Sequence, residues 1–479
     1  MASAPAASGN PVAALAGSLP PGLVTADPER LAPHLLDWRG TKRGVADLLA
    51  LPRSTAEVVA LVRTARAHGA ALVPQGGNTG LVGGSVPEPA SGRPTILVSM
   101  RRMARIRAVD PAGLSLVAEA GAILADVHEA ARAAGAMFPL SLGAKGSATI
   151  GGLVSTNAGG TQVLRHGTMR NLVLGLEAVL PDGTVLDQLK PLRKDTAGYD
   201  VKQLLIGGEG TLGIVTAAAL RLVPAPAVSA VAWAGVPDMT AALALLARLR
   251  RAVGERVESF ELMGDEGLAL VLAHVPSARA PLATPAPFHC LVELTDVDPE
   301  APLAARLEAV LAAALEAGEV RDATVAATLA QAQALWALRE ELPVAEKADG
   351  PSLKNDVAVA VADVPAFDAA ARKAVAQHFP GARPLVFGHL GDGNLHWNLR
   401  PPAGADAGSW LAQHGEAARR LLHDVVVRFG GTISAEHGIG TARAAELARL
   451  GDPGRLAAMR AIKAALDPAG IMNPGKLPL

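Results

Sequence analysis

Two hydrophobic periodicities alternate along the first half of the chain. Ser54 and Glu57 have the spacing of a helix capping box, and the apolar positions that follow recur on one helical face until Gly69. Residues 71–73 form a short apolar run, typical of a buried strand, and lead into the glycine-rich segment 74–84. The same order then recurs as a strand over 114–118, a helix over 123–134 and a glycine-rich stretch over 143–160.

The second half of the chain follows a different pattern. The glycine clusters end near residue 225, and long segments rich in Ala and Leu take up helical spacing, over 239–253, 301–317, 324–341 and 453–466. Four prolines between 276 and 287 predict a surface loop. We therefore divide the chain into a flexible tail (1–20), an N-terminal domain (21–225), a second domain (226–435) and a C-terminal segment (436–479).

Composition narrows the classes of protein to consider. Half of the 479 residues are hydrophobic and 19% are charged, enough apolar material for large cores in more than one domain. The formal net charge is -1, so no basic excess favours a nucleic-acid partner. Cys290 is the single cysteine and lies in an apolar run, so we expect a buried strand residue. Without a basic signal region or an apolar stretch of spanning length, we expect a soluble, cytoplasmic protein with no membrane span.

The glycine-rich stretches indicate a large phosphate-bearing ligand. Residues 74–80 read Pro-Gln-Gly-Gly-Asn-Thr-Gly directly after a strand. Backbone amides in such a loop can approach an anion closely, and the simpler interpretation of one such loop is a tight structural turn. Because similar clusters return, we favour a cofactor threaded through one domain; these clusters are at 143–147, 151–152, 159–160 and 207–213.

Two nucleotide-binding motifs do not account for these loops. The chain has no G-x-x-x-x-G-K-[ST] sequence, which disfavours a P-loop NTPase. Residues 208–213 match G-x-G-x-x-G, but residues 214–222 alternate as a strand rather than a helix. No acidic residue follows at about twenty positions, where a ribose contact would be expected. We interpret this match as a false Rossmann signal.

Three histidines and a carboxylate gather towards the C-terminus. His389, His396 and Glu436 are residue types that hold a divalent transition metal with coordination positions left open, and His437 adds a titratable base. The spacing of the first two histidines is odd, so a continuous strand would send them to opposite faces. Gly391-Asp392-Gly393 must therefore turn the chain for the imidazoles to converge. A single histidine more often satisfies a backbone carbonyl, but for the whole set we favour metal binding.

With these motifs the chain resembles flavoproteins of the vanillyl-alcohol oxidase / p-cresol methylhydroxylase superfamily, and among them the FAD-linked D-2-hydroxyacid dehydrogenases. The resemblance rests on the histidine and glutamate segments together with residues 74–84, 139–160, 207–216 and 473–476. It implies an α+β fold with a two-subdomain FAD-binding domain of the p-cresol methylhydroxylase (PCMH) type over 21–225. An α+β substrate (cap) domain over 226–435 and a C-terminal helical segment that returns to the flavin, 436–479, would follow.

The resemblance also implies which residues contact FAD. Segment 74–80 would wrap the pyrophosphate, segment 139–160 would line the isoalloxazine and ribityl region, Glu209 and its neighbours would hold the adenine side, and Asn473 would reach back to the flavin. The loop offers Gly77 and Asn78 where covalent attachment usually needs His or Cys, so FAD is expected to be non-covalent. The implied contacts are Pro74, Gln75, Gly76, Gly77, Asn78, Thr79, Gly80, Pro139, Leu140, Gly143, Gly146, Ser147, Gly151, Gly152, Asn157, Gly159, Gly160, Glu209, Gly210, Ile214, Val215 and Asn473.

By the same resemblance, His389, His396 and Glu436 would be ligands of a divalent metal ion, with zinc as the expected one. His437 would be the general base that takes the proton of the substrate C2 hydroxyl as the hydride passes to flavin N5. Arg339, Lys354 and Asn398 would bind the substrate and its carboxylate.

Two features near Arg339 qualify the substrate assignment. Glu340 and Glu341 stand beside it, so an ordinary salt bridge on a charged helix is the alternative interpretation. Four residues further on the chain has Pro343, where D-2-hydroxyglutarate enzymes tend to carry a hydroxyl residue. This departure weakens the hydroxyglutarate interpretation without excluding it.

The function implied is FAD- and metal-dependent oxidation of a D-2-hydroxy acid, D-2-hydroxyglutarate or D-lactate, to the 2-oxo acid. Electrons would pass to an acceptor such as an electron-transfer flavoprotein or a quinone, and a homodimer is compatible with this reading. Two alternatives stay open. One is a flavin alcohol oxidase or an alkyl-transferring synthase of the same fold, and the other is the FAD subunit of a multi-chain glycolate oxidase-like complex.

Overall fold

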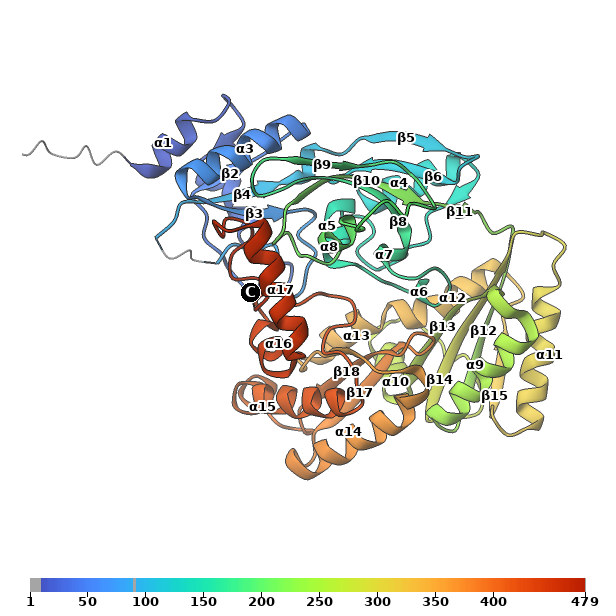
Figure 1. The fold of residues 1–479 in the computed structure, drawn as a ribbon. Helices are drawn as coiled ribbons and strands as arrows, with labels where there is room; N and C mark the ends of the chain where they lie inside the picture. The colour runs from blue at the N-terminus through green and yellow to red at the C-terminus, as the bar shows by residue number, and fades with distance from the viewer. Residues whose placement is uncertain (1–9, 89–91, 479) are drawn as a thin grey trace, which may run out of the picture. The chain divides into compact units, whose positions relative to one another are not determined.

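In the computed structural model, which describes residues 10–88 and 92–478, the chain forms two compact units (Figure 1). Unit 1 comprises residues 1–158, 168–224 and 437–479, and unit 2 comprises residues 159–167 and 225–436. Helices and sheets are combined in both, so the predicted α+β class is confirmed. The C-terminal residues from His437 onward belong to unit 1 although they follow all of unit 2 in sequence.

Unit 1 contains a small sheet that carries the first glycine-rich loop. Its strand order is β1-β2-β4-β3, with β2, β4 and β3 parallel and β1 antiparallel to β2. The C-terminal segment extends this sheet, because the Leu72 N–H donates to the carbonyl of Ile471 and the Asn473 N–H donates to the carbonyl of Leu72. The strands are β1 (Val24–Thr25), β2 (Leu48–Ala50), β3 (Ala71–Gln75) and β4 (Thr95–Ser99).

A larger antiparallel sheet forms the rest of the core of unit 1. Its order is β5-β6-β10-β8-β9, and its apolar side chains join a single buried cluster with those of the smaller sheet. The strands are β5 (Ile106–Asp110), β6 (Ser115–Glu119), β8 (Val173–Val179), β9 (Val185–Gln188) and β10 (Ile214–Arg221), with the short pair β7 (Ala136–Met137) and β11 (Val223–Pro224) beside them. Strand β10 follows the G-x-G-x-x-G match directly, which confirms that this match is not a Rossmann motif.

Most helices of unit 1 are short, and α3 begins at its predicted cap. The Ser54 hydroxyl accepts from the Glu57 N–H at 3.3 Å, and the Glu57 carboxylate accepts from the N–H of Arg53 at 2.6 Å. Gly69 ends the helix in the left-handed conformation, as predicted. The helices are α1 (Pro11–Gly17), α2 (Pro28–Leu31), α3 (Thr55–His68), α4 (Leu124–Ala133), α5 (Ile150–Thr156), α7 (Met169–Leu172), α8 (Lys202–Leu205), α16 (Ala444–Leu450) and α17 (Pro453–Leu466).

The prediction of a flexible tail over 1–20 is wrong for its second half. Residues 11–17 form α1, which begins at an Asn10 cap with Pro11 in the first turn. Leu15 and Leu19 are buried in the core of unit 1. Burial of these two leucines stabilises a short helix that its Ala-rich composition does not reveal. Residues 1–9 of the predicted tail lie outside the described residues.

Unit 2 is built on one antiparallel sheet in the order β15-β12-β14-β13-β17-β18-β16. Cys290 lies on β14 and is fully buried, as predicted. Part of the predicted helix over 324–341 is wrong, because residues 322–325 form the edge strand β15. The strands are β12 (Val228–Val236), β13 (Val257–Gly264), β14 (Phe288–Asp296), β15 (Asp322–Val325), β16 (Asp356–Ala358), β17 (Arg383–His389) and β18 (Asn394–Arg400).

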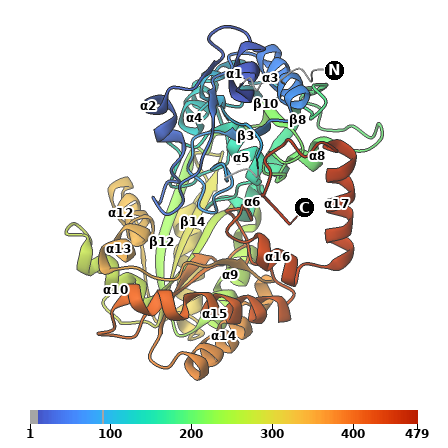
Figure 2. The ribbon, with the colours of Figure 1, turned by 90° about the vertical axis from the view of Figure 1, so that its left-hand side faces the viewer.

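Helices cover both faces of this sheet. One face packs in a core with α9 (Met239–Val253), α11 (Leu303–Glu316), α14 (Val364–His378) and α15 (Ala407–Arg428). Figure 2 shows α14 and α15 side by side. The other face packs with α10 (Asp265–His274), α12 (Leu329–Glu340) and α13 (Leu342–Asp349). Segment 159–167, with α6 (Val163–His166), contacts β13. Side chains alternate along a strand, so the side chains that point towards α12 and α13 stand at every second position of each strand.

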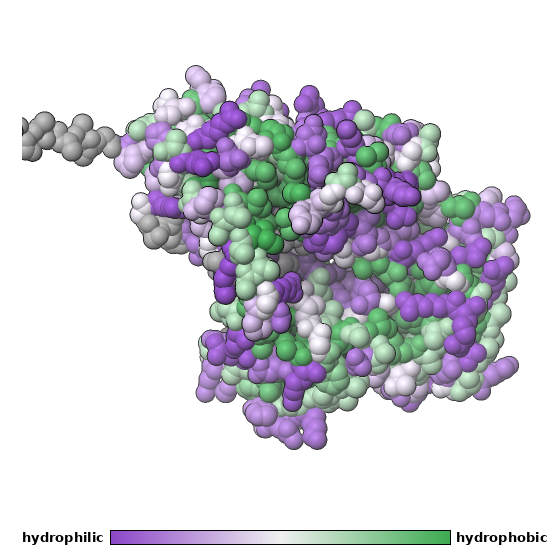
Figure 3. All heavy atoms as spheres, in the orientation of Figure 1, coloured by the Kyte–Doolittle hydropathy of each residue, from purple (hydrophilic) through white to green (hydrophobic). Residues whose placement is uncertain are grey.

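On the face drawn in Figure 3, hydrophilic and apolar side chains are intermixed. Among residues 10–88 and 92–478, no helix combines the length and apolar character that crossing a membrane requires.

Candidate active site

The two predicted histidine ligands lie on adjacent strands of unit 2. Strand β17 ends at His389, and β18 begins after a turn at residues 390–393. His396 pairs with Phe387, which precedes His389 by two positions, so the two histidines are diagonal neighbours on one face of the sheet. Their ring centroids are 5.9 Å apart. The predicted turn that brings these imidazoles together is therefore confirmed.

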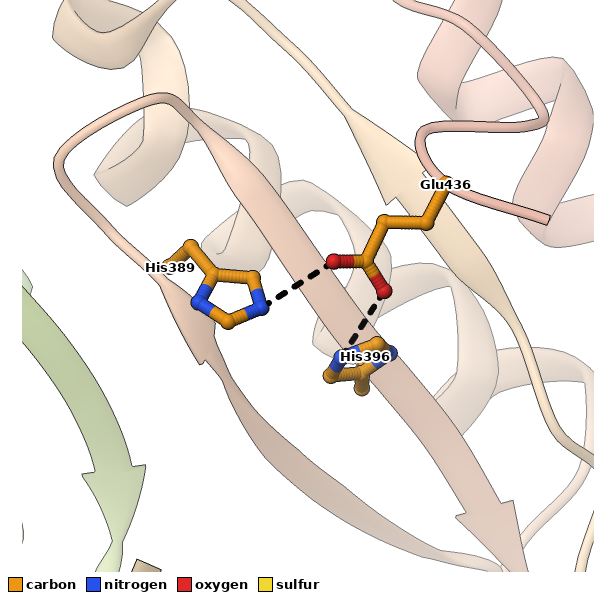
Figure 4. A group of neighbouring side chains, drawn as sticks. All are labelled: His389, His396 and Glu436. Carbon is orange, nitrogen blue, oxygen red and sulfur yellow. Dashed lines mark ion pairs between the residues drawn. The ribbon is translucent and has the colours of Figure 1, made fainter. Parts of the chain in front are cut away.

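Glu436 completes the group from a separate segment. After α15 the chain runs beside β16, where the Glu436 N–H donates to the Asp356 carboxylate at 3.0 Å. The Glu436 carboxylate lies between the imidazoles (Figure 4), with Oε1 3.2 Å from Nε2 of His389 and Oε2 3.8 Å from Nε2 of His396. One candidate ligand atom from each residue lies within 4.8 Å of the others. Two imidazoles and a carboxylate at these distances fit a zinc-type site.

The protonation of this group suits metal binding. Burial lowers the pKa of His396 to about 4, so this imidazole is neutral and has a lone pair for a metal ion. Burial alone would raise the pKa of Glu436, but its hydrogen bond to His389 and the charge of that histidine lower the pKa to about 2. Burial would likewise lower the pKa of His389, but Glu261 and Glu436 raise it well above its ordinary value. A cation at this position would take the place of the His389 proton.

Glu261 lies behind His389 and was missed by the sequence analysis. It is on β13, its side chain is 1% exposed, and its Oε1 accepts from Nδ1 of His389 at 2.7 Å. The other oxygen, Oε2, accepts from Nε of Arg339 at 3.0 Å. All eight residues of β13 are buried, and a buried carboxylate in such a strand requires partners. Two carboxylates in one short strand, Glu258 and Glu261, were the signal available in the sequence.

Arg339 lies on α12 on the same face of the sheet as the histidines. Its ion-pair partner is Glu261 of β13 rather than the adjacent Glu340 or Glu341. The guanidinium carbon lies 5.0 Å from the centre of the Phe387 ring. Among the described residues, the two terminal amino groups of Arg339 donate no hydrogen bond. They are therefore available to a carboxylate ligand.

A second buried carboxylate, Glu346 on α13, connects the other two predicted substrate residues. Its oxygens accept from the Asn398 amide at 3.0 and 3.1 Å and from the Ser352 hydroxyl at 2.6 Å, and it forms an ion pair with Lys354. The Asn398 carbonyl oxygen accepts from the Asn355 N–H at 3.1 Å. Lys354 and Asn398 are thus brought together by Glu346, which the sequence analysis also missed.

In unit 1 the predicted flavin loops pack directly against one another. A Cβ atom on Gly77 would lie 1.9 Å from the Ser147 carbonyl oxygen, and one on Gly76 would lie 2.2 Å from the Thr149 hydroxyl. Only glycine allows this approach. Among the described residues, the Thr149 hydroxyl and Oδ1 of Asn473 are buried without a hydrogen-bond partner. Closely packed glycine loops with unpaired polar atoms fit a phosphate-bearing cofactor such as FAD.

The C-terminal segment and the loop at Glu209 join this region. The Asn473 amide donates to the carbonyls of Glu209 and Gly84 at 2.7 and 3.0 Å. A Cβ on Gly210 would lie 2.4 Å from Pro74. Ile214 and Val215 are buried at the start of β10. The loops at Pro74, Glu209 and Asn473, far apart in sequence, therefore meet within unit 1.

The Glu209 side chain has partners other than those implied by the resemblance. Its two oxygens accept from the N–H groups of Ile439 and Gly440 at 2.8 and 2.7 Å. These residues follow His437, the predicted base, so Glu209 fixes the turn that carries it. Burial raises the pKa of Glu209, although both amides act in the opposite direction.

The remaining predicted flavin residues have varied surroundings. Side chains of Gln75 and Asn78 donate to backbone carbonyls, Gln75 to His34 and Ser85 and Asn78 to Leu36. Asn157 ends α5 in a left-handed backbone conformation, and its side-chain oxygen accepts from the N–H of Arg170 at 2.9 Å. Two predicted contacts are in unit 2, because Gly159 and Gly160 begin its segment 159–167. The other predicted contacts are in unit 1: Thr79, Gly80, Pro139, Leu140, Gly143, Gly146, Gly151 and Gly152.

Two parts of the chain match models of known protein families. Residues 46–188 match the FAD binding domain, and residues 225–477 match the FAD linked oxidases, C-terminal domain. The chain belongs to the FAD-linked oxidase family. The predicted PCMH-type FAD-binding domain and the flavin cofactor are thereby confirmed.

Several curated relatives share sequence with nearly the whole chain. D-2-hydroxyglutarate dehydrogenase from Bos taurus mitochondria is 39% identical over 95% of this chain and 81% of its own length. The enzyme of that name from Xanthomonas citri pv. viticola is 39% identical over 94% of this chain and 93% of its own length. The mitochondrial enzyme from Arabidopsis thaliana is 38% identical over 95% and 79%.

Solved structures show the same fold at low sequence identity. p-Cresol methylhydroxylase with substrate bound is 14% identical, with a TM-score of 0.74 over 97% of this chain and 96% of that chain. Alkyldihydroxyacetonephosphate synthase is 20% identical, with a TM-score of 0.73 over 99% and 87%. At this level of identity the likeness concerns the FAD-linked oxidase fold and not the reaction.

Proposed function

We propose that this protein oxidises a D-2-hydroxy acid to the 2-oxo acid with non-covalent FAD and a divalent metal ion, zinc being the first choice. The observation that carries the proposal is the convergence of His389, His396 and Glu436 in a chain of the FAD-linked oxidase family. Relatives named D-2-hydroxyglutarate dehydrogenase support the substrate class.

The chemistry divides between the bound groups and the chain. FAD, when bound, supplies the acceptor for the hydride that leaves C2 of the substrate. His389, His396 and Glu436 would hold the metal ion, and the chemistry that it would supply is that of a Lewis acid for the C2 hydroxyl. His437 takes the hydroxyl proton, and Glu209 keeps the turn after His437 in place.

Two cationic side chains in unit 2 define the acid that fits. The terminal amino groups of Arg339 bind one carboxylate in the bidentate geometry that guanidinium favours. Lys354 supplies a second positive charge, but its ion pair with the buried Glu346 offsets that charge. A dicarboxylate such as D-2-hydroxyglutarate uses both cations, and D-lactate uses only one.

We take D-2-hydroxyglutarate as the first substrate to test because the relatives carry its name. D-Lactate is the second candidate, since Pro343 removes a hydroxyl donor near Arg339 and Glu346 already pairs Lys354. An electron-transfer flavoprotein or a quinone as electron acceptor, a homodimer and a cytoplasmic location stay predictions.

The test is anaerobic titration of the purified yellow protein with D-2-hydroxyglutarate, D-lactate and their L-isomers. Absorbance in the flavin bands reports reduction directly. Bleaching by a D-isomer alone supports the proposal, and the acid that reduces the flavin faster is the substrate. A flavin-loaded protein that none of the four acids reduces contradicts it.

A further inference from the structure

One carboxylate in unit 2 contacts both parts of the proposed substrate site. Glu261 accepts from Nδ1 of His389 through Oε1 and from Nε of Arg339 through Oε2. These contacts span 128 and 78 positions of sequence. Glu261 therefore joins strand β17, which carries a metal ligand, to helix α12, which carries the proposed carboxylate anchor.

Placing a carboxylate at this position has a cost that the contacts must offset. The Glu261 side chain is 1% exposed. Moving an ionised carboxylate out of water is strongly unfavourable unless the charge is paired. The nearby charges of His389 and Arg339 compensate it, so that its pKa is lowered despite burial. With one partner on each oxygen, Glu261 constrains the orientation of both partners rather than only balancing charge.

Each contact leaves a defined atom facing the proposed reaction site. A hydrogen bond at Nδ1 fixes the His389 ring so that Nε2 points to Glu436 and to the metal position. The bond at Nε of Arg339, together with the Phe387 ring below the guanidinium, directs the two terminal amino groups outward. The same carboxylate therefore sets the orientation of a metal ligand and of an anion anchor.

We propose that Glu261 is a positioning residue that orients His389 for the metal ion and Arg339 for the substrate carboxylate. This inference rests on the proposed function, because both partners derive their roles from it. Beyond that function, we expect the affinities for the metal ion and for the substrate both to depend on Glu261, which contacts neither of them.

Substitution of Glu261 by Gln tests the inference. Gln has nearly the same size, but one of its two terminal atoms is an NH2 donor instead of an acceptor, so one of the two hydrogen bonds of Glu261 is lost. Metal-stripped, FAD-loaded protein is titrated with Zn²⁺ against a chromophoric chelator. We expect Zn²⁺ affinity to fall about 10- to 100-fold in E261Q, the usual effect of removing an outer partner of a ligating histidine.

Two further variants separate positioning from other effects. Glu258 lies on the same strand with its side chain 3% exposed, but it pairs with Arg165 and His166, so E258Q is the matched control for loss of a buried carboxylate. We expect E258Q to keep wild-type Zn²⁺ affinity. E261D keeps the charge with a shorter reach, and we expect it to bind Zn²⁺ more weakly than the wild type.

Kinetics provide a second measurement on the same proteins. At saturating Zn²⁺, E261Q is expected to raise KM for the hydroxy acid more than it lowers kcat, because Arg339 is no longer held. Flavin content and the thermal unfolding midpoint confirm that each variant is folded.

The outcomes are distinguishable. Wild-type Zn²⁺ affinity in E261Q or E261D, or an equal loss in E258Q, overturns the role of Glu261. If the wild-type protein itself binds no Zn²⁺, the metal part of the proposed function fails, and the role of Glu261 towards His389 fails with it. That result is seen in the wild-type titration before any variant is measured.

Discussion

The N–H group of Gly440 donates to Oε2 of Glu209 at 2.7 Å, across 231 positions of sequence. Glu209 itself has a left-handed backbone with a φ of 49°, a conformation that a residue with a side chain rarely adopts. Such backbone strain persists where surrounding contacts enforce it, and it is frequent at functional sites. Here it places the Glu209 carboxylate against the N–H groups of Ile439 and Gly440, shortly after His437.

Substitution of Glu209 by Gln should therefore loosen this turn. Losing one charge-assisted hydrogen bond to a buried amide costs about 1–3 kcal/mol. We expect E209Q to keep its flavin, to unfold at lower denaturant concentration and to reduce the flavin more slowly. Stopped-flow absorbance and urea unfolding measure the two effects, with the exposed E129Q as control. Wild-type flavin reduction in E209Q would show that the turn is held by other contacts.

Removal of the proposed base should separate flavin binding from flavin reduction. In H437A we expect the flavin spectrum to be retained, while anaerobic reduction by the substrate slows about 100- to 10,000-fold, as is usual for loss of a general base. The measurement is single-turnover bleaching of the flavin at several pH values. Retained fast reduction in H437A would eliminate His437 as the base.

Loss of a metal ligand should remove metal and activity together. We expect H396A to weaken Zn²⁺ binding more than about 100-fold, because removal of even an outer partner costs about 10- to 100-fold. Elemental analysis of the purified protein and Zn²⁺ titration provide the measurement. The exposed His378 on α14 offers a matched control, since H378A removes an imidazole of unit 2 that lies outside the group of His389, His396 and Glu436. Unchanged metal content in H396A would refute ligation by His396.

The sequence predicts the histidine pair more fully than its surroundings. The odd spacing and the intervening glycines require a turn between His389 and His396, because strand geometry is local. The roles of Glu261 and Glu346 depend instead on contacts between distant segments, which no local pattern contains. The resemblance implied that Glu209 contacts the adenine side of FAD, but its hydrogen bonds to the amides of Ile439 and Gly440 follow only from the fold.

The errors in the elements have similar causes. Residues 322–325 are paired with β12 as an edge strand, although the Ala-rich pattern extends the predicted helix back to 324. The Thr328 hydroxyl accepts from the Gln331 N–H at 3.2 Å and marks the true start of α12, so the correct signal was a capping residue. In the residues before Thr328, pairing with β12 determines the structure in spite of a composition that favours a helix.

Glu293 gives a prediction for stability that is independent of the metal site. It lies on β14, where burial and the neighbouring charge of Glu258 raise its pKa to about 7. The pKa of Glu293 in the folded protein lies above the ordinary value, so protonated Glu293 favours the folded state. This contribution to the free energy of unfolding is complete below pH ~4.5 and is lost as the pH rises through about 7. Ionised Glu293 therefore destabilises the folded protein at alkaline pH.

Substitution of Glu293 by Gln should remove this penalty. A shift from 4.5 to about 7 corresponds to about 3 kcal/mol at most, so we expect E293Q to gain stability over the wild type between pH 5 and pH 8 by an amount of that order. The free energy of urea unfolding of FAD-loaded protein, measured at both pH values, provides the test. If the difference in unfolding free energy between wild type and E293Q does not change with pH, Glu293 titrates at its ordinary pKa.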